Sequence, residues 1–277
     1  ATAASPLISA AGMVMISPSN TSPSLTSDLV GNAGKDWHAG YYRTAHNDLF
    51  QGAAMAKFVH DELGMTTAAA IHDGDPYTQG LAQAFSDAFE ALGGTMTGFT
   101  GINKEDTDMV PVLTEVAAGS PEALFFPIFQ PAGDFIAAQA PTVAGLENVT
   151  LLAADGLQVS SFMGLDQADG MFISGPDLRY GENTNQSTGV TAESFLQTYE
   201  ANNGSSPEAS FWAHSYDAAT ILLEAIKAAS FVNDGELTID RAGVREYLNG
   251  LSGYSGIIGS LTCDEFGDCG AQRITVI

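Results

Sequence analysis

Residues 67–99 read TAAAIHDGDPYTQGLAQAFSDAFEALGGTMTGF, and this stretch decides the fold. The short apolar run 67–71 predicts a buried strand, and the polar cluster 72–77 after it predicts a turn. The apolar spacing of residues 80–92 predicts a helix that ends at two glycines, and residues 95–99 predict the next strand. A strand, a turn, a helix and a second strand in this order are typical of a parallel βαβ unit.

The same alternation continues on both sides of this stretch. Residues 106–118 and 133–140 predict helices, and residues 123–128 and 149–153 predict buried strands. Strands that alternate with helices in this way indicate an α/β fold with an open parallel sheet that is covered on both faces. Additional elements are expected as a strand at 14–16 and helices at 51–63, 191–202, 214–229 and 240–251.

Two later segments have different patterns. The polar segment 181–187 lacks apolar periodicity, which predicts a mobile surface loop. The tail 259–277 is expected to form a hairpin with its turn at 264–268. Cys263 and Cys269 flank that turn, so their β-carbons could approach across it. We expect a disulfide between them; a metal-binding or redox pair is the alternative, although a redox pair is normally spaced CxxC.

Composition and charge exclude several classes of function. The chain has 277 residues, of which 45% are hydrophobic, and this is enough for a large buried core. Its 33 acidic and 9 basic residues give a net charge of −24, which repels nucleic acid and anionic lipid. Such a charge suits either a saline habitat or a cationic ligand. The charge leads us to expect no nucleic-acid partner. No run approaches the roughly 20 apolar residues of a membrane-spanning helix, so we also expect no direct insertion into a membrane.

Signatures of catalysis and of metal binding are weak. The 5 histidines show no spacing that suits a zinc site, and no phosphate-binding loop or nucleophile elbow occurs. Asp73 and Asp75 beside His72 could form an acid/base group, but the intervening Gly74 and Pro76 favour a turn. The sequence therefore predicts a protein that is not an enzyme and that holds no metal and no other cofactor.

Candidate ligand contacts follow the apolar runs. Ligands of open parallel sheets bind at the carboxyl ends of the strands, and the loops at those ends are 17–22, 73–77, 129–131 and 155–156. Hydroxyls and amides of the first loop could receive a carboxylate, Asp155 could neutralise an ammonium group, and Tyr77 and Phe129 could form a wall. Taken singly, these residues are more typical of turns, helix caps or core than of ligand contacts.

Several short segments, spread over almost the whole chain, occur in a recognisable order. They are Gly12 to Pro23, Tyr42-Arg43-Thr44 with Asp48 and Gln51-Gly52, Ile71-His72-Asp73 with Tyr77 and Gly80, Asp155-Gly156, Tyr216-Asp217-Ala218 and Asp264 to Asp268. In this order they resemble the type I periplasmic binding proteins of the branched-chain amino acid (Leu/Ile/Val) ABC transporter family.

The resemblance implies a fold of two Rossmann-like lobes with parallel sheets, joined by a hinge of three crossover strands. Lobe one would hold 1–44 and 176–259, and lobe two would hold 45–175 and 260–277. Members of the family begin with a further strand-helix-strand-helix portion that carries a ligand-contacting serine. We therefore expect the N-terminal part of lobe one to be missing from this chain.

The resemblance also implies a function and its residues. The protein would be an extracytoplasmic solute-binding protein, periplasmic or anchored at the cell surface, that closes its hinge around an amino acid or similar small polar solute. It would deliver this ligand to the membrane subunits of an ABC permease. Thr21 with the backbone near Ser19 would contact the ligand carboxylate, Tyr77 and Phe129 would form the aromatic wall, and Asp155 would face the ammonium.

Two departures from the family leave the ligand open. Asn20 replaces the small residue expected at its position, and Asp155 is shorter than the family's common Glu. A ligand-sensing domain of a signalling receptor with the same fold is the alternative function. An enzyme on the same frame is a further alternative, for which His72 and Asp73 are the acid/base candidates.

Overall fold

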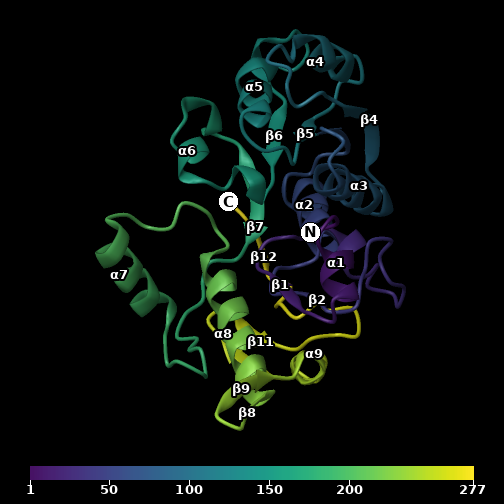
Figure 1. Cartoon of the computed structure of the whole chain (residues 1–277). Helices are drawn as coiled ribbons and strands as arrows, with labels where there is room; N and C mark the ends of the chain where they lie inside the picture. The colour runs from purple at the N-terminus through teal and green to yellow at the C-terminus, as the bar shows by residue number, and fades with distance from the viewer. The chain divides into compact units, whose positions relative to one another are not determined.

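The computed structural model describes residues 1–277, and its internal contacts divide the chain into two units (Figure 1). Unit 1 comprises 1–47, 177–207 and 211–273, and unit 2 comprises 48–176, 208–210 and 274–277. The chain thus passes between the units at 47–48, 176–177 and 273–274, and residues 208–210 make one further short excursion into unit 2. The division into lobes proposed from the sequence stays a prediction.

Unit 2 is built on a six-stranded sheet with the strand order β12-β7-β6-β5-β3-β4. All neighbours pair in parallel except β12, which runs antiparallel to β7. The strands are β3 (Thr67–His72), β4 (Thr95–Gly101), β5 (Ala123–Phe125), β6 (Thr150–Ala153), β7 (Phe172–Pro176) and β12 (Ile274–Val276). Because β4 and β5 lie on opposite sides of β3, the strand order reverses at β3, and such a reversal is where doubly wound sheets bind ligands.

Helices cover both faces of this sheet. They are α2 (Asp48–Lys57), which continues as a π-helix over Phe58–Glu62, α3 (Pro76–Ala91), α4 (Val110–Ala117), α5 (Ala132–Gln139) and the short α6 (Ser160–Met163). Each predicted strand and helix between residues 67 and 153 overlaps an observed one. The sheet order and the helices agree with the α/β fold class expected from the sequence.

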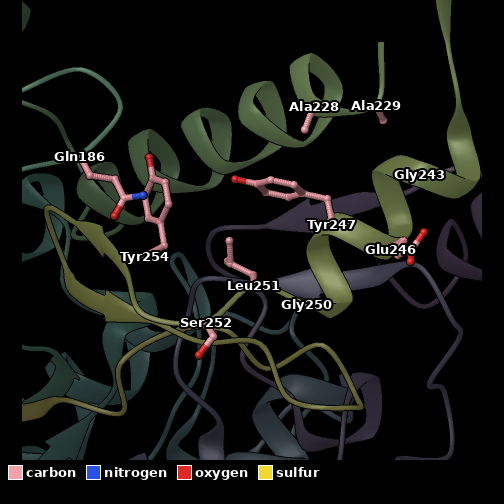
Figure 2. A pocket seen from close by; sticks show the side chains of 10 residues that line it. All are labelled: Gln186, Ala228, Ala229, Gly243, Glu246, Tyr247, Gly250, Leu251, Ser252 and Tyr254. Carbon is pink, nitrogen blue, oxygen red and sulfur yellow. The ribbon is translucent and has the colours of Figure 1, made fainter. Parts of the chain in front are cut away.

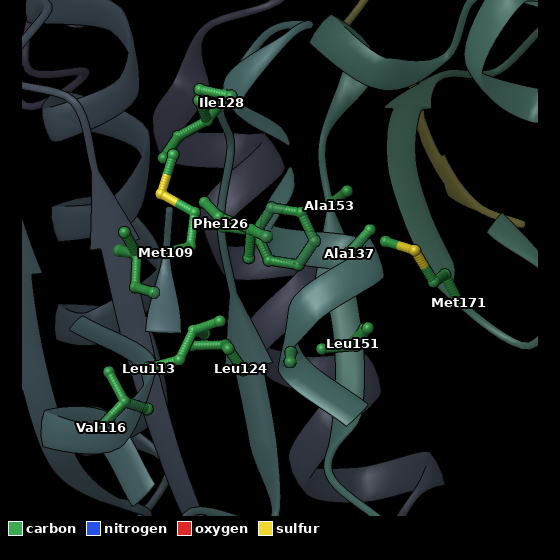
Figure 3. Packing of buried hydrophobic residues seen from close by; sticks show 14 of the residues in the cluster. Met109, Leu113, Val116, Leu124, Phe126, Ile128, Ala137, Leu151, Ala153 and Met171 are labelled. Atoms are coloured by element: carbon green, nitrogen blue, oxygen red, sulfur yellow. The ribbon is translucent and has the colours of Figure 1, made fainter. Parts of the chain in front are cut away.

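The core of unit 2 shows why these strands form. Leu124 and Phe126 point into one apolar cluster with α4 and α5 (Figure 3), whereas Phe125 packs on the other face with α2 and α3. On β6, Leu151 and Leu152 divide between the two clusters in the same way. Successive side chains of a strand point to opposite faces, so a continuous apolar run is required when both faces are buried.

Unit 1 has shorter strands and longer helices. β1 (Met15–Ser17) pairs in parallel with β2 (Tyr41–Arg43), and β10 (Tyr254–Gly256) forms a hairpin with β11 (Gly259–Leu261). The helices are α1 (Ser5–Ala10), α7 (Ala192–Asn203), α8 (Trp212–Ala228) and α9 (Arg241–Asn249). A second hairpin of β8 (Ser230–Asn233) and β9 (Glu236–Ile239) was not predicted, although Asp234-Gly235 between its strands is a typical two-residue hairpin turn and both residues have a positive φ.

The tail does not form the single hairpin that was predicted. Residues 259–261 pair with β10, and residues 274–276 join the sheet of unit 2 beside β7. Only the turn at 264–268 is as expected, and Asp264 Oδ1 accepts the backbone N–H groups of Phe266 and Asp268 at 2.9 Å each. The structure joins Cys263 and Cys269 by a disulfide, as the sequence analysis expected.

Residues 260–273 make their contacts within unit 1. The physical reason is hydrogen bonding to β2. The backbone N–H of Arg43 donates to Gly267 O at 2.9 Å, and the N–H of Cys269 donates to Arg43 O at 3.0 Å.

The segment 181–187 lies outside any helix or strand and is mostly exposed, as expected of a surface loop, but one of its residues anchors it. Asn185 is fully buried, and its side-chain amide donates to Asp217 Oδ1 at 2.9 Å and to Thr220 Oγ1 at 2.8 Å. Asp217 Oδ1 and Oδ2 in turn accept the backbone N–H groups of Ile257 and Ile258. This buried network attaches the segment to α8, and polar composition alone could not reveal it.

A charged cluster in unit 1 leads to a prediction about pH. Asp177 accepts hydrogen bonds from Arg179 Nε at 2.7 Å and Arg273 Nη2 at 2.9 Å, and Arg179 first of all lowers the pKa of Asp177 to about 2. The pKa of Asp177 is lower in the folded protein than in the unfolded chain. Its ion pairs therefore stabilise the fold fully above about pH 4, and this stabilisation is lost as the pH falls through about 2. We expect urea unfolding to show a stability difference between the protein and Asp177→Asn that is constant from pH 7 to pH 4 and shrinks below it. A difference independent of pH would contradict this assignment.

Candidate functional site

Three of the predicted ligand residues meet at the carboxyl edge of the unit 2 sheet. Tyr77 lies in the first turn of α3 after β3, Phe129 follows β5, and Asp155 follows β6. The Tyr77 hydroxyl donates to Asp155 Oδ1 at 3.0 Å, and the rings of Tyr77 and Phe129 lie 5.3 Å apart between centroids, tilted by 39°. The structure therefore brings together an acid and two aromatic rings that are far apart in sequence.

Asp155 is the centre of this group. Its carboxyl is only 9% exposed, and Oδ1 also accepts a hydrogen bond of 2.7 Å from Gln51 Nε2 on α2. Both bonds go to Oδ1, so Oδ2 can receive a donor from a ligand. A carboxylate held in one orientation by two neutral donors suits an ammonium group.

Gln51 and Ser174 belong to the group but were given no role from the sequence. Gln51 Nε2 also lies 3.1 Å from both the carbonyl and the hydroxyl oxygen of Ser174 on β7. Gln51 reaches this edge because the adjacent Gly52 lets α2 approach α3 closely; a β-carbon there would lie 2.7 Å from the Ala84 β-carbon. The Gln51-Gly52 pair was a motif of the resemblance, and only the structure shows what it contacts.

The aromatic residues differ in exposure and in chemistry. Burial, and after it the negative charge of Asp155, raises the pKa of Tyr77 well above its ordinary value, so this hydroxyl stays protonated and acts as a donor at neutral pH. Phe129 is 51% exposed and covers Gly156, where an added β-carbon would lie 3.0 Å from its ring. The result is an apolar wall beside a fixed carboxylate.

Gly156→Ala therefore tests the wall. We expect its new methyl group to move the Phe129 ring by a few tenths of an ångström, which lowers ligand affinity by a few fold and changes stability by less than about 1 kcal/mol. Isothermal titration and thermal unfolding measure the two effects. Gly80→Ala in α3 is the matched control, because its β-carbon would meet open space. Equal affinity for both variants would show that the position of Phe129 is unimportant.

The other predicted contacts, Ser19, Asn20 and Thr21, follow β1 and form a separate group in unit 1. Ser17 organises the start of this loop, since its hydroxyl donates to Asn20 Oδ1 at 3.1 Å and accepts the N–H of Asn20 at 3.0 Å. Ser19 and Asn20 are exposed, whereas Thr21 is only 1% exposed and its Oγ1 has no hydrogen-bond partner. A buried hydroxyl without a partner is costly in a protein interior and is a candidate ligand contact.

The acid/base candidates are held in a turn. Asp73 Oδ1 accepts the N–H of Asp75 at 2.9 Å as well as the Thr78 hydroxyl, and His72 Nδ1 accepts the N–H of Gly74 at 3.1 Å. Burial lowers the pKa of His72. These bonds support the turn that the sequence favoured. No group of three or more His, Cys, Asp or Glu side chains is arranged to hold a metal ion.

A hollow of about 540 Å³ lies in unit 1, and Figure 2 shows the residues that line it, which come from α8, α9, β10 and the loops beside them. None of the predicted ligand residues is among them. Two of its polar side chains already have partners: the Tyr254 hydroxyl bonds to Ser187 Oγ and Asn185 Oδ1, and Gln186 Oε1 accepts the N–H of Ser255. The edge of the unit 2 sheet is therefore the better candidate site.

No helix of the structure combines the length and the apolar character needed to cross a membrane.

Comparison with known proteins finds relatives over almost the whole chain. The periplasmic binding protein family matches residues 1–268. A Leu/Ile/Val-binding protein homolog of Brucella melitensis is 26% identical over 98% of this chain and 68% of its own length. A leucine-, isoleucine-, valine-, threonine- and alanine-binding protein of Pseudomonas aeruginosa is 26% identical over 93% of this chain and 62% of its own length. The chain thus spans about two thirds of the length of the curated relatives that it matches.

The solved structures confirm the fold class. The crystal structure of a leucine-binding protein from Thermotoga maritima superposes with a TM-score of 0.77 at 24% identity, covering 99% of this chain and 74% of the other. An isoleucine complex of a branched-chain amino acid transporter substrate-binding protein from Streptococcus pneumoniae superposes with a TM-score of 0.72 at 19% identity, covering 100% of this chain and 72% of the other. The resemblance inferred from the sequence is confirmed, and the chain belongs to the periplasmic binding protein family.

Proposed function

We propose that this protein is the solute-binding component of an ABC transporter and that it binds an amino acid with an apolar side chain. The observation that carries the proposal is the buried Asp155 carboxylate, which Tyr77 and Gln51 orient beside the exposed Phe129 ring. An α-amino acid with an apolar side chain matches both features at once. The curated relatives, which bind leucine, isoleucine and valine by name, support this class of ligand.

Each part of the ligand has a proposed partner. Asp155 Oδ2 accepts from the ammonium group, and Tyr77 and Phe129 contact the apolar side chain. The buried Thr21 hydroxyl, with the backbone N–H near Ser19, donates to the ligand carboxylate. Pairing these charged ends with protein groups offsets the cost of removing them from water.

The proposed action is binding without chemistry. A ligand shifts an equilibrium between conformations only by its better affinity for one of them. We propose that amino-acid binding favours a closed arrangement of the protein, and that the membrane subunits of a permease recognise this arrangement. The Cys263–Cys269 disulfide supports a location outside the cytoplasm, because disulfides persist in oxidising compartments.

A thermal-unfolding screen tests the proposal. The purified protein is heated with each common amino acid, with amides and with small carboxylates, since a ligand that binds only the folded state raises the melting temperature. We expect leucine, isoleucine or valine to give the largest increase, equivalent to about 2.7 kcal/mol at a concentration of 100 times Kd.

Two leucine analogues serve as matched controls. 4-Methylpentanoate lacks the ammonium group, and 3-methylbutylamine lacks the carboxylate. We expect neither to raise the melting temperature, because each leaves one buried protein group unpaired. An increase with 4-methylpentanoate equal to that with leucine would contradict the role of Asp155. No increase with any amino acid would contradict the proposed ligand class.

A further inference from the structure

One fully buried side chain holds the loop that follows β1. Arg43, at the end of β2, is 0% exposed, and its Nη1 donates to Ser22 O at 2.9 Å and to Asn20 O at 3.2 Å. Nη2 donates to Thr26 Oγ1 at 2.7 Å, and Nε donates to the Asp268 carboxylate. A single guanidinium therefore connects the loop after β1 with the disulfide-closed turn, and all of these groups lie in unit 1.

The two carbonyl groups that Nη1 contacts belong to the residues on either side of Thr21. Residues 18–22 lie outside any helix or strand, so no backbone ladder fixes their conformation. Fixing the Asn20 carbonyl restricts the peptide plane that precedes Thr21, and fixing the Ser22 carbonyl restricts the peptide plane between Ser22 and Pro23. The direction of the buried Thr21 hydroxyl thus depends on where Arg43 is held.

Asp268 in turn holds Arg43, and its own position is fixed by a short closed loop. The disulfide joins residues six apart in sequence around it, and Asp264 Oδ1 accepts the Asp268 N–H at 2.9 Å. Gly267 packs closely against β2, since a β-carbon added to Gly267 would lie 2.2 Å from Tyr41 O. A carboxylate on such a restrained loop keeps the guanidinium in one place.

We propose that Arg43 and Asp268 are positioning residues that orient Thr21 for the carboxylate of the ligand. This inference rests on the proposed function, in which Thr21 contacts that carboxylate. Neither residue touches the ligand; both act through the backbone of the loop. Hydrogen bonds that include a charged partner are the stronger ones, and this suits them to holding a loop without regular structure.

Amide hydrogen exchange of the whole protein tests the positioning without ligand. The variants are Asp268→Asn, which keeps the shape of the side chain and removes its charge, and Thr26→Val, which removes one bond from Arg43 and leaves the ion pair. Trp37→Phe is the matched control, since it removes the hydrogen bond of 3.0 Å from Trp37 Nε1 to Phe266 O and reduces the ring contact with Phe266 in the same turn, while it leaves the bonds of Arg43 in place. We expect exchange at residues 18–26 to accelerate about tenfold in the first two variants and to stay unchanged in the third.

Titration with L-leucine tests the consequence for binding. We expect Asp268→Asn and Thr26→Val to weaken binding by about tenfold, and Trp37→Phe to bind like the unchanged protein. Thr21→Val removes the hydroxyl that the pair orients, so Asp268→Asn should weaken the Thr21→Val variant much less than it weakens the unchanged protein. A purely structural effect of Asp268 would instead add in full to that of Thr21.

The outcomes separate this inference from the function on which it rests. Unchanged exchange at 18–26, or faster exchange with full leucine affinity, overturns the positioning role. Full affinity of Thr21→Val, or no leucine binding by the unchanged protein, overturns the proposed function and this inference with it. Loss of affinity in Thr21→Val without loss in Asp268→Asn and Thr26→Val overturns the inference alone. If Asp268→Asn fails to fold, Thr26→Val decides between these results.

Discussion

Replacement of Arg43 by methionine is expected to lower the free energy of unfolding by about 3–5 kcal/mol. The change leaves the Asp268 carboxylate, whose side chain is 5% exposed, as a buried charge without its partner. It also removes the donors to Asn20 O, Ser22 O and Thr26 Oγ1. Unpaired buried groups cost more than a paired network contributes, so the loss is large. Urea unfolding at pH 7 measures it.

Two further variants identify the cause. Arg43→Met combined with Asp268→Leu is expected to recover part of the stability, because an apolar pair of similar volume often replaces a buried ion pair at little cost. Arg179→Met removes a guanidinium that is 79% exposed from the Asp177 carboxylate, and we expect a loss below about 1 kcal/mol. A loss of that small size for Arg43→Met would show that its burial contributes little.

Asp155→Asn is expected to weaken leucine binding by about 2 kcal/mol or more, which is a rise in Kd of about 30-fold. The substitution removes the charge that we assign to the ammonium group. Its remaining carbonyl oxygen can still accept from Tyr77 and Gln51, so the melting temperature of the ligand-free protein should change little. Isothermal titration and thermal unfolding measure the two quantities separately.

Asp73→Asn is the matched control for this experiment. Asp73 follows the neighbouring strand β3 and carries the same charge, but its Oδ1 serves the turn that begins α3. We expect leucine affinity to stay the same in this variant. Equal losses in both variants would indicate a general effect of the negative charge at this edge of the sheet, and full affinity in Asp155→Asn would rule out the proposed contact.

The elements of unit 2 were largely predictable because their signals are local. Phe125 and Phe126 lie next to each other and fill opposite faces of the sheet, so the strand must be a continuous apolar run. Asp75 accepts the N–H of Tyr77 and caps α3, which begins at Pro76, earlier than the start at residue 80 that the apolar spacing predicted. Tyr77, Phe129 and Asp155 were predicted to converge from one rule, the meeting of strand ends at one edge of a parallel sheet.

The sequence by itself therefore determined the class of fold, the edge of the sheet and the residue types available there, since periodicity, caps and strand ends are read over a few neighbouring residues. Only the tertiary structure decided which side chains meet. Gln51 and Asp155 are 104 residues apart, and Arg43 and Asp268 are 225 apart. Their bonds depend on how helices and loops pack, and a pattern read over a few neighbouring residues cannot predict contacts between residues so far apart in sequence. For the same reason the burial of Asn185 and the pairing of β12 with β7 appeared only in the folded chain.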